Sequence, residues 1–219
     1  MTGPLQPVKH GSLKEQVRDK IREAIFRSQY EPGDALREAH LANELQVSQS
    51  TVREALFELE HVGLVVRVPN KGTTVTKFTR EEMLERLDIR VRLEEMAWVE
   101  AAVHMKPEHF ERLRRHLKIF TEAIEKNSHF ESAQADLQFH RYLWRQCGND
   151  TLCRMLNQLT VPLFAFISIK RKSGQQNLKE VVPSHEDVVQ SIQTNDPEKI
   201  KAALRRHFEE IRSMSESAL

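Results

Sequence analysis

The segment from residue 80 to residue 216 constrains the fold most, because it contains no alternating β-branched run that would predict a strand. Apolar residues recur there at spacings of three and four, which is typical of amphipathic helices. Thr79 begins a capping box, and Pro107 and Pro197 suit the first turn of a helix. The sequence therefore predicts an all-α helical bundle with six helices, over about 79–104, 107–126, 129–147, 150–171, 177–194 and 196–217.

The N-terminal part, residues 8–77, differs from the bundle in its glycine content, because five of the seven glycines lie before residue 75. Ser48 suits a helix N-cap and Gly63 a helix end. Three helices are predicted, over about 12–28, 37–45 and 48–63. Two β-branched runs joined by a turn predict a hairpin, over 64–68 and 73–77. The predicted fold is mainly α, with a winged helix-turn-helix over residues 8–77 and a helical bundle over residues 80–216.

Charge and hydropathy exclude some classes of protein but do not by themselves indicate nucleic-acid binding. The net charge is +1, and residues 1–77 hold 11 Lys and Arg against 10 Asp and Glu. No stretch approaches the roughly 18 apolar residues of a membrane span. The N-terminus lacks the apolar core of a secretory signal. We expect a cytoplasmic protein with no membrane segment, and an argument for DNA binding must come from the residue pattern.

The third predicted helix begins with side chains that suit DNA. In a helix-turn-helix this end enters the major groove, and here it carries no acidic residue that would meet phosphates. Gln49 and Arg53 suit bidentate contacts with base edges. The hydroxyls of Ser48, Ser50 and Thr51 suit phosphate oxygens. The alternative is that these hydroxyls only cap the helix.

Two further places are predicted to contact the DNA. Arg37 begins the second helix, from which its guanidinium can reach a phosphate. The wing tip consists of Asn70, Lys71 and Gly72 and carries one charge and little bulk. It therefore suits the minor groove or the sugar-phosphate backbone.

Three histidines and one aspartate lie on the apolar faces of predicted bundle helices. Asp136 and His140 share one face, and His185 and His207 each lie on the apolar stripe of a later helix. A lone buried histidine is usually a hydrogen-bonded core residue, but four such side chains on three helices can meet at the centre of a bundle. Three imidazoles and a carboxylate suit Zn²⁺, Ni²⁺, Fe²⁺ or Mn²⁺, and we favour zinc.

Arg90 lies in the first bundle helix, which is almost wholly apolar over residues 96–103 and is therefore expected to be central. An arginine that faces the interior can pair bidentately with the carboxylate of an effector. The alternative is a structural ion pair with Glu94, one helical turn away.

Residues 30–75 resemble the DNA-binding domain of the GntR family of bacterial transcription regulators, through the successive pieces VREAL, LE, GLV, PN and G. Many relatives carry Arg at the position of Gln49, so the resemblance implies a different operator here. It also implies contact with a double-stranded DNA operator by Arg37, Ser48, Gln49, Ser50, Thr51, Arg53, Asn70, Lys71 and Gly72.

Residues 80–216 resemble the FCD domain, the ligand-binding partner of the FadR subfamily of GntR regulators. The matching pieces are Arg90-x-x-Leu93-Glu94, Asp136-x-x-Phe139-His140, Asn149-x-x-Leu152, His185 and His207. In many FCD domains the aspartate and the three histidines bind a divalent metal, and an organic acid completes its coordination. The resemblance implies this metal-binding role for Asp136, His140, His185 and His207, and a VanR-like bundle of six helices.

The favoured function is a transcription regulator whose operator affinity is controlled by a small carboxylate effector at the metal. A homodimer is expected, because two-fold proteins read palindromic half-sites. One alternative is a metal-dependent hydrolase or oxygenase with an appended DNA-binding domain, and another is a purely structural metal. A non-enzyme is favoured because Glu186 and Asp187, beside His185, are expected to point away from the site.

Overall fold

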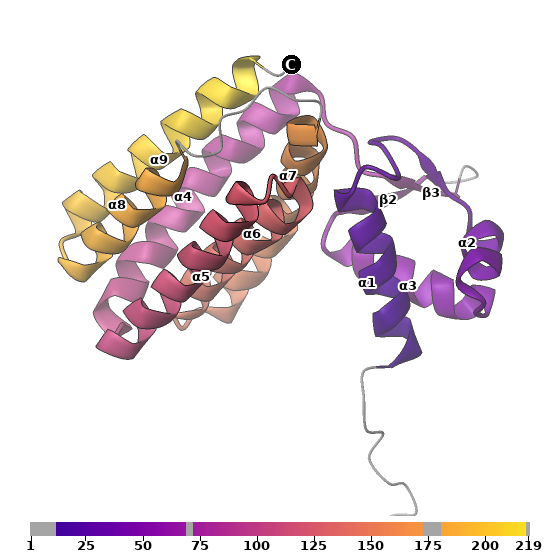
Figure 1. The fold of residues 1–219 in the computed structure, drawn as a ribbon, viewed down its shortest axis with the longest axis horizontal. Coiled ribbons are helices and arrows are strands. Elements are labelled where there is room, and N and C mark those ends of the chain that lie inside the picture. Colours follow the sequence, from indigo (N-terminus) through magenta and orange to yellow (C-terminus); the bar gives the residue numbers. More distant parts are fainter. Residues whose placement is uncertain (1–11, 69–71, 173–180, 218–219) are drawn as a thin grey trace, which may run out of the picture.

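The computed structural model describes residues 12–68, 72–172 and 181–217, which form two units (Figure 1). The N-terminal unit, described over residues 12–68 and 72–75 and here called the reader, is a winged helix-turn-helix. The C-terminal unit, described over residues 80–172 and 181–217, is the bundle. The predicted fold class is therefore confirmed.

The reader's helices begin where the sequence predicts. Its elements are α1 Leu13–Phe26, β1 Ala35–Leu36, α2 Glu38–Leu45, α3 Gln49–His61, β2 Val65–Val68 and β3 Gly72–Val75. The hydroxyl of Ser12 accepts from the backbone N–H of Glu15, whose side chain accepts in return from the Ser12 N–H. Ser48 caps α3 by accepting from the Thr51 N–H at 3.1 Å. These caps satisfy backbone donors that have no partner inside a helix.

The reader's sheet has one strand more than predicted. β2 and β3 form the expected hairpin, with Val65 opposite Val75. β1 pairs with the other edge of β3, so the strand order is β1-β3-β2. Two residues are too few to show an alternating pattern, which is why β1 was not predicted. The predicted wing-tip residues Asn70 and Lys71 lie outside the described residues.

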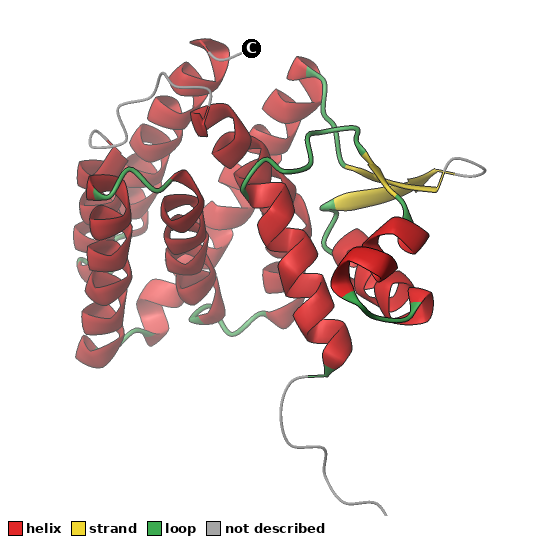
Figure 2. Cartoon of the chain, turned by 45° about the vertical axis from the view of Figure 1, so that its right-hand side comes forward, coloured by secondary structure: helices red, strands yellow, loops and turns green. Residues whose placement is uncertain are grey.

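The bundle contains, among its described residues, the six predicted helices. They are α4 Arg80–His104, α5 Pro107–Glu125, α6 His129–Arg145, α7 Asp150–Lys172, α8 Val181–Gln193 and α9 Pro197–Ser217. The helix expected over 177–194 is described from Val181 onward, because residues 173–180 are not described. Figure 2 shows the strands in the reader, whereas the described part of the bundle consists of helices joined by loops. None of the helices described has the length and apolar character needed to span a membrane.

Helix α4 lies at the centre of the bundle, as its apolar composition predicts. It packs against α6, α7, α8 and α9. Its inner face nevertheless carries two charged side chains, Arg90 and Glu94, and both are fully buried next to Trp98. Burying charges is expensive unless they are paired. The partners of these two side chains must therefore lie inside the bundle.

The reader packs against α7 of the bundle. The hydroxyl of Ser168 in α7 donates to the carbonyl oxygen of Phe26, the last residue of α1, at 2.9 Å. Gly63, with φ +73°, lies so close to α7 that a Cβ there would be 3.2 Å from the carbonyl oxygen of Gln158. Pro162, four residues after Gln158, has no N–H to donate to that oxygen. The gap in the α7 hydrogen-bond ladder therefore lies at the boundary between the two units.

Candidate functional site

Three histidines meet inside the bundle, and each comes from a different helix. His140 lies on α6, His185 on α8 and His207 on α9, and none is more than 1% exposed. One ring nitrogen of each lies within 4.8 Å of those of the other two. The structure thus brings together the three histidines that the sequence pattern singles out.

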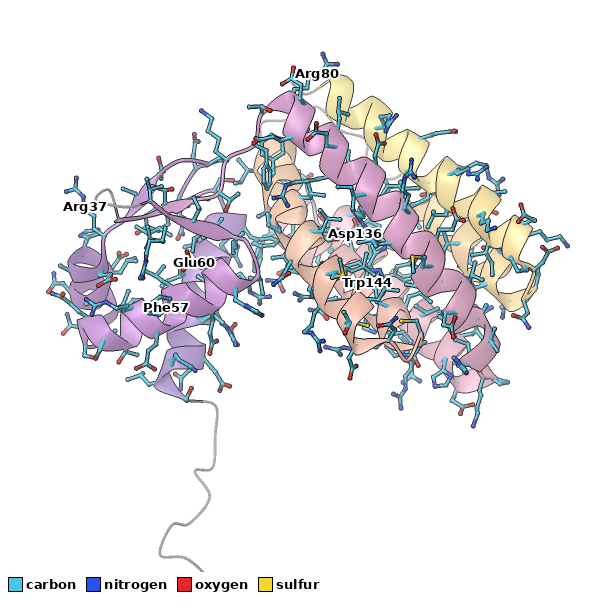
Figure 3. All side chains as sticks on the ribbon, turned by 180° about the vertical axis from the view of Figure 1, so that it is seen from behind. Arg37, Phe57, Glu60, Arg80, Asp136 and Trp144 are labelled. Atoms are coloured by element: carbon cyan, nitrogen blue, oxygen red, sulfur yellow. The ribbon has the colours of Figure 1, made fainter. Side chains whose placement is uncertain are left out.

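Asp136 joins this cluster from one turn before His140, and its side chain points into the bundle (Figure 3). Its Oδ1 lies 2.9 Å from Nε2 of His185 and 3.5 Å from Nε2 of His140. Two ligands each about 2.1 Å from one ion lie about 3.0 Å apart at a right angle and about 3.4 Å apart at a tetrahedral angle. The observed separations therefore suit atoms that share one metal ion.

The Nδ1 atoms of His140 and His185 face away from the histidine cluster, and their hydrogen bonds indicate which ring nitrogen carries the proton. His140 Nδ1 lies 2.9 Å from Oε2 of Glu94, and His185 Nδ1 lies 2.9 Å from the carbonyl oxygen of Val181. A carboxylate and a carbonyl oxygen only accept hydrogen bonds. We infer that both Nδ1 atoms carry a proton and donate, which leaves each Nε2 with its lone pair when the ring is neutral. His185 Nε2 lies 2.9 Å from Oδ1 of Asp136, to which it donates when the ring is protonated.

His207 is held in the same way by a hydroxyl. Its Nδ1 lies 2.9 Å from Oγ of Ser184, and that Oγ donates its own proton to the carbonyl oxygen of Val181 at 2.8 Å. The hydroxyl therefore accepts from His207 Nδ1. His207 Nε2, like that of His140, is buried without a partner in the described part of the chain. Three imidazole lone pairs and one carboxylate converge, and a divalent cation satisfies all four.

The sequence pattern assigns only part of the role of Glu94. Its Oε1 accepts from Nε of Arg90 at 2.6 Å, and its Oε2 accepts from Nδ1 of His140 at 2.9 Å. A carboxylate behind a metal-binding histidine orients the ring and raises its basicity. The four-residue spacing from Arg90 was visible in the sequence, whereas His140 is 46 residues away. Ser184 gave no comparable signal.

The pKa shifts of Glu94 and His207 agree with these contacts. Burial lowers the pKa of His140, but the charge of Glu94 and the hydrogen bond to Asp136 raise it overall. Burial by itself raises the pKa of Glu94, but the charges and hydrogen bonds of His140 and Arg90 lower it to about 2. Glu94 is therefore a carboxylate that can accept from both neighbours. Burial, and then the neighbouring His185 and His140, lower the pKa of His207 well below its usual range. A neutral imidazole is the form that binds a metal.

The structure shows the ion pair between Arg90 and Glu94 and is compatible with the second interpretation, in which Arg90 binds an effector. Its Nε pairs with Glu94, as the structural alternative expects, while Nη1 and Nη2 are buried without a partner among the described residues. The guanidinium lies over the rings of Phe164 and Phe208, with its carbon 5.0 and 4.7 Å from their centroids. Unpaired buried donors are costly, so this end of Arg90 is suited to an anionic ligand.

The predicted DNA-contacting side chains of α3 lie on the surface of the reader. Ser48, Gln49, Ser50 and Arg53 are exposed, and Thr51 is half-buried. The hydroxyl of Ser48 also contacts those of Ser50 and Thr51, at 2.8 Å each. Capping and DNA contact are compatible, because Gln49 and Ser50 remain exposed.

Arg53 makes an ion pair that the sequence did not reveal. Its Nε and Nη2 donate to Oε2 of Glu38 in α2 at 2.9 and 2.7 Å. Arg37, which precedes α2, is exposed at the end of the reader away from the bundle (Figure 3). Gly72 begins β3 with φ +86°, a conformation that favours glycine. Leu36 pairs with Thr73, so Arg37 and Gly72 lie next to each other at one end of this strand pair, whereas Asp136 lies inside the bundle.

A winged helix-turn-helix next to an all-helical bundle is the architecture of a DNA-binding regulatory protein. Family models agree: that of the bacterial regulatory proteins of the gntR family matches residues 13–75, and that of the FCD domain matches residues 85–210. The chain belongs to the GntR family of transcription regulators and carries an FCD domain. The family predicted from the sequence is confirmed.

Relatives with assigned roles are transcription regulators. A probable D-xylose utilization operon transcriptional repressor of Paenarthrobacter nicotinovorans is 30% identical over 196 residues, covering 90% of this chain and 85% of that protein. A gluconate operon transcriptional repressor of Bacillus licheniformis is 24% identical, covering 97% of this chain and 89% of that protein. The solved structure of E. coli McbR/YncC has a TM-score of 0.82 at 23% identity and covers 95% of this chain and 99% of that one, which supports the fold.

Glu94→Gln is expected to lower the affinity for a divalent metal by about 10- to 100-fold, the usual effect of removing a carboxylate behind a metal-binding histidine. Competition with a chromogenic chelator measures this affinity. The control is His140→Ala, which should leave the protein metal-free after dialysis. An unchanged affinity in Glu94→Gln would mean that Glu94 serves only Arg90, and an unchanged metal content in His140→Ala would remove the metal site itself.

Proposed function

We propose that this GntR regulator is a repressor whose operator affinity is controlled by a small carboxylate bound at a divalent metal in the bundle. One observation carries the proposal: three histidine Nε2 atoms and the Asp136 carboxylate converge beside the unpaired end of Arg90. The proposed domains are a DNA-binding domain over residues 8–77 and an effector-binding domain over residues 80–216. The names of the relatives support repression as the sign of regulation.

The proposed metal ligands are Asp136, His140, His185 and His207. The chemistry of three imidazoles and one carboxylate fits Zn²⁺, Ni²⁺, Fe²⁺ or Mn²⁺, and zinc is the preferred candidate. When bound, the ion supplies a Lewis-acidic centre with room for an oxygen ligand. The hydrogen bonds to Glu94, Val181 and Ser184 hold the three rings in place for it.

The proposed effector is a small organic acid with a second acceptor group for Arg90. Nη1 and Nη2 of Arg90 can donate in parallel to two oxygen atoms of one carboxylate. The indole N–H of Trp98 is also buried without a partner in the described structure, and its ring lies 5.8 Å from that of His140. These donors favour a ligand-binding site over a purely structural metal, which would leave them unpaired.

A regulator is favoured over a metal-dependent hydrolase or oxygenase because the site offers no free general base among the described side chains. Asp136 faces the imidazoles, and Glu94 already accepts from Arg90 and His140. Asp187 lies on the surface, where it pairs with Arg206 at 2.7 Å. Turnover of a small acid that requires the metal would favour the enzyme instead.

The proposed partner of the reader is a double-stranded operator with palindromic half-sites. The N-terminal end of α3 enters the major groove, with Gln49 and Arg53 at base edges and Ser48, Ser50 and Thr51 at phosphates. The proposed flanking contacts to the DNA come from Arg37 and from the wing residues Asn70, Lys71 and Gly72.

A homodimer is proposed through the outer face of α4. Ile89, Met96 and Val103 repeat every seven residues along this helix and are 50, 59 and 65% exposed. A seven-residue apolar repeat is the pattern by which one helix packs along another. A second copy of the chain is the proposed occupant, because a palindromic operator requires two readers related by a two-fold axis.

Arg53→Ala is expected to weaken binding to duplexes selected from a random pool by about 5- to 150-fold, since one bidentate base contact contributes about 1–3 kcal/mol of discrimination. A mobility-shift titration measures the loss. Arg115→Ala, at an exposed arginine of α5, is the control and should bind as the parent does. Equal affinity in Arg53→Ala would show that the DNA-contacting surface is wrongly assigned.

Arg90→Ala is expected to weaken the binding of small dicarboxylates by about 10-fold or more, because charged hydrogen bonds are lost, while the metal affinity changes far less. Isothermal titration calorimetry measures both on the full chain. Arg90→Lys retains the charge without the planar guanidinium, so its affinity for the acid should lie between those of the parent protein and Arg90→Ala. Equal losses of metal affinity and acid affinity would show that Arg90 is only a structural partner of Glu94.

Met96→Glu is expected to convert the dimer into a monomer, because it places two like charges on the two-fold related face of α4. Sedimentation velocity measures the mass. Ile119→Glu on α5, where Ile119 is 55% exposed, is a matched control that should remain dimeric. Dimerisation that survives Met96→Glu would place the interface elsewhere.

A further inference from the structure

A cleft between the reader and the bundle is rich in arginine. It has a volume of about 660 Å³, and four arginines line it from both units. Arg18 and Arg22 come from α1, and Arg141 and Arg145 come from α6. Pockets that bind small molecules usually measure about 300–1,000 Å³, so the cleft is large enough for a metabolite.

The carboxylates of the cleft neutralise only one of these arginines. Arg18 pairs with Asp19 and with Glu58, at 3.0 Å each. Glu58 is also held by Lys14, which lies 2.6 Å away. The remaining three arginines, Arg22, Arg141 and Arg145, form no ion pair within the described parts of the chain.

Two of the unpaired arginines, Arg22 and Arg141, have no charged acceptor for their partly buried N–H groups. Nε of Arg22 is buried and has no partner among the described residues. Nε of Arg141 donates at 2.7 Å to the side-chain oxygen of Asn157, which is a neutral acceptor. Burial, and then the charges of Arg22 and Arg145, lower the pKa of Arg141 to about 10. Arg141 and Arg145 are one helical turn apart, a spacing at which like charges repel.

We propose that this cleft binds a small organic phosphate between Arg22, Arg141 and Arg145. Three guanidinium groups offer paired N–H donors that match the oxygens of a phosphate dianion. The apolar side chains of Phe57 and Val161 also line the cleft and suit the remainder of such a molecule. The ligand would neutralise the excess charge and would bridge α1 of the reader to α6 of the bundle.

The cleft is distinct from both proposed sites of the regulator. It lies at the Glu58 end of α3, about 13 Å along the helix from Gln49 at 1.5 Å per residue. None of the four proposed metal ligands lines it. The inference therefore stands whether or not the buried histidines hold a metal.

Thermal denaturation and calorimetry of the full chain with glucose 6-phosphate and inorganic phosphate test the proposal. Glucose is the neutral control, and sodium chloride matches the ionic strength. At 100 times the dissociation constant, glucose 6-phosphate is expected to raise Tm by about 5–10 °C. The double variant Arg22→Gln with Arg145→Gln should lose affinity at least about tenfold.

Two further variants separate this site from other binding sites. Arg115→Gln removes an exposed arginine elsewhere and should bind phosphate normally, and His140→Ala should do so as well. Loss of binding in His140→Ala would place the phosphate at the metal site and overturn the proposal. Equal binding by the parent and the double variant would also overturn it. So would a result in which the double variant loses only affinity for duplex DNA, because the arginines would then hold the DNA backbone.

Discussion

The carboxylate of Glu94 is the contact on which the interior of the bundle depends. It compensates a buried guanidinium on its own helix and holds the His140 ring of α6. A carboxylate left without these partners at full burial would be strongly destabilising. The same contacts leave His140 Nε2 and the outer nitrogens of Arg90 pointing away from Glu94 and unpaired. One side chain thus stabilises the fold and holds in place two of the groups proposed to bind ligands, the His140 ring and the guanidinium of Arg90.

The architecture could be read from the sequence because each of its signals is local. Caps, glycine stops and apolar periodicity act within one or two helical turns, so the helices of both units were predicted to within a few residues. β1 was not predicted because it is only two residues long and owes its extended form to pairing with β3, nearly forty residues later. A strand that forms only by pairing with a distant segment shows no alternation of apolar and polar residues in its own sequence.

The site was only partly predictable for the same reason. Helical faces identified Asp136 and the histidines, since each lies on an apolar stripe. Glu94 and Ser184 were not assigned, because their roles arise from contacts with His140 and His207 across helices. The reader's ion pair between Arg53 and Glu38 spans fifteen residues and was likewise invisible. Sequence patterns located the four proposed metal ligands, whereas packing between helices supplied the groups that orient them.

The proline in α7 has a mechanical consequence. Pro162 interrupts the hydrogen-bond ladder, so the half-helix that follows is joined to the first half by fewer bonds than an unbroken helix would have. Phe164 on this half-helix lies under Arg90 and beside the ring of His140. One turn later, Ser168 holds the end of α1. The half-helix after Pro162 thus contacts the buried polar cluster of the bundle through Phe164 and the reader through Ser168, so one short segment connects the two units.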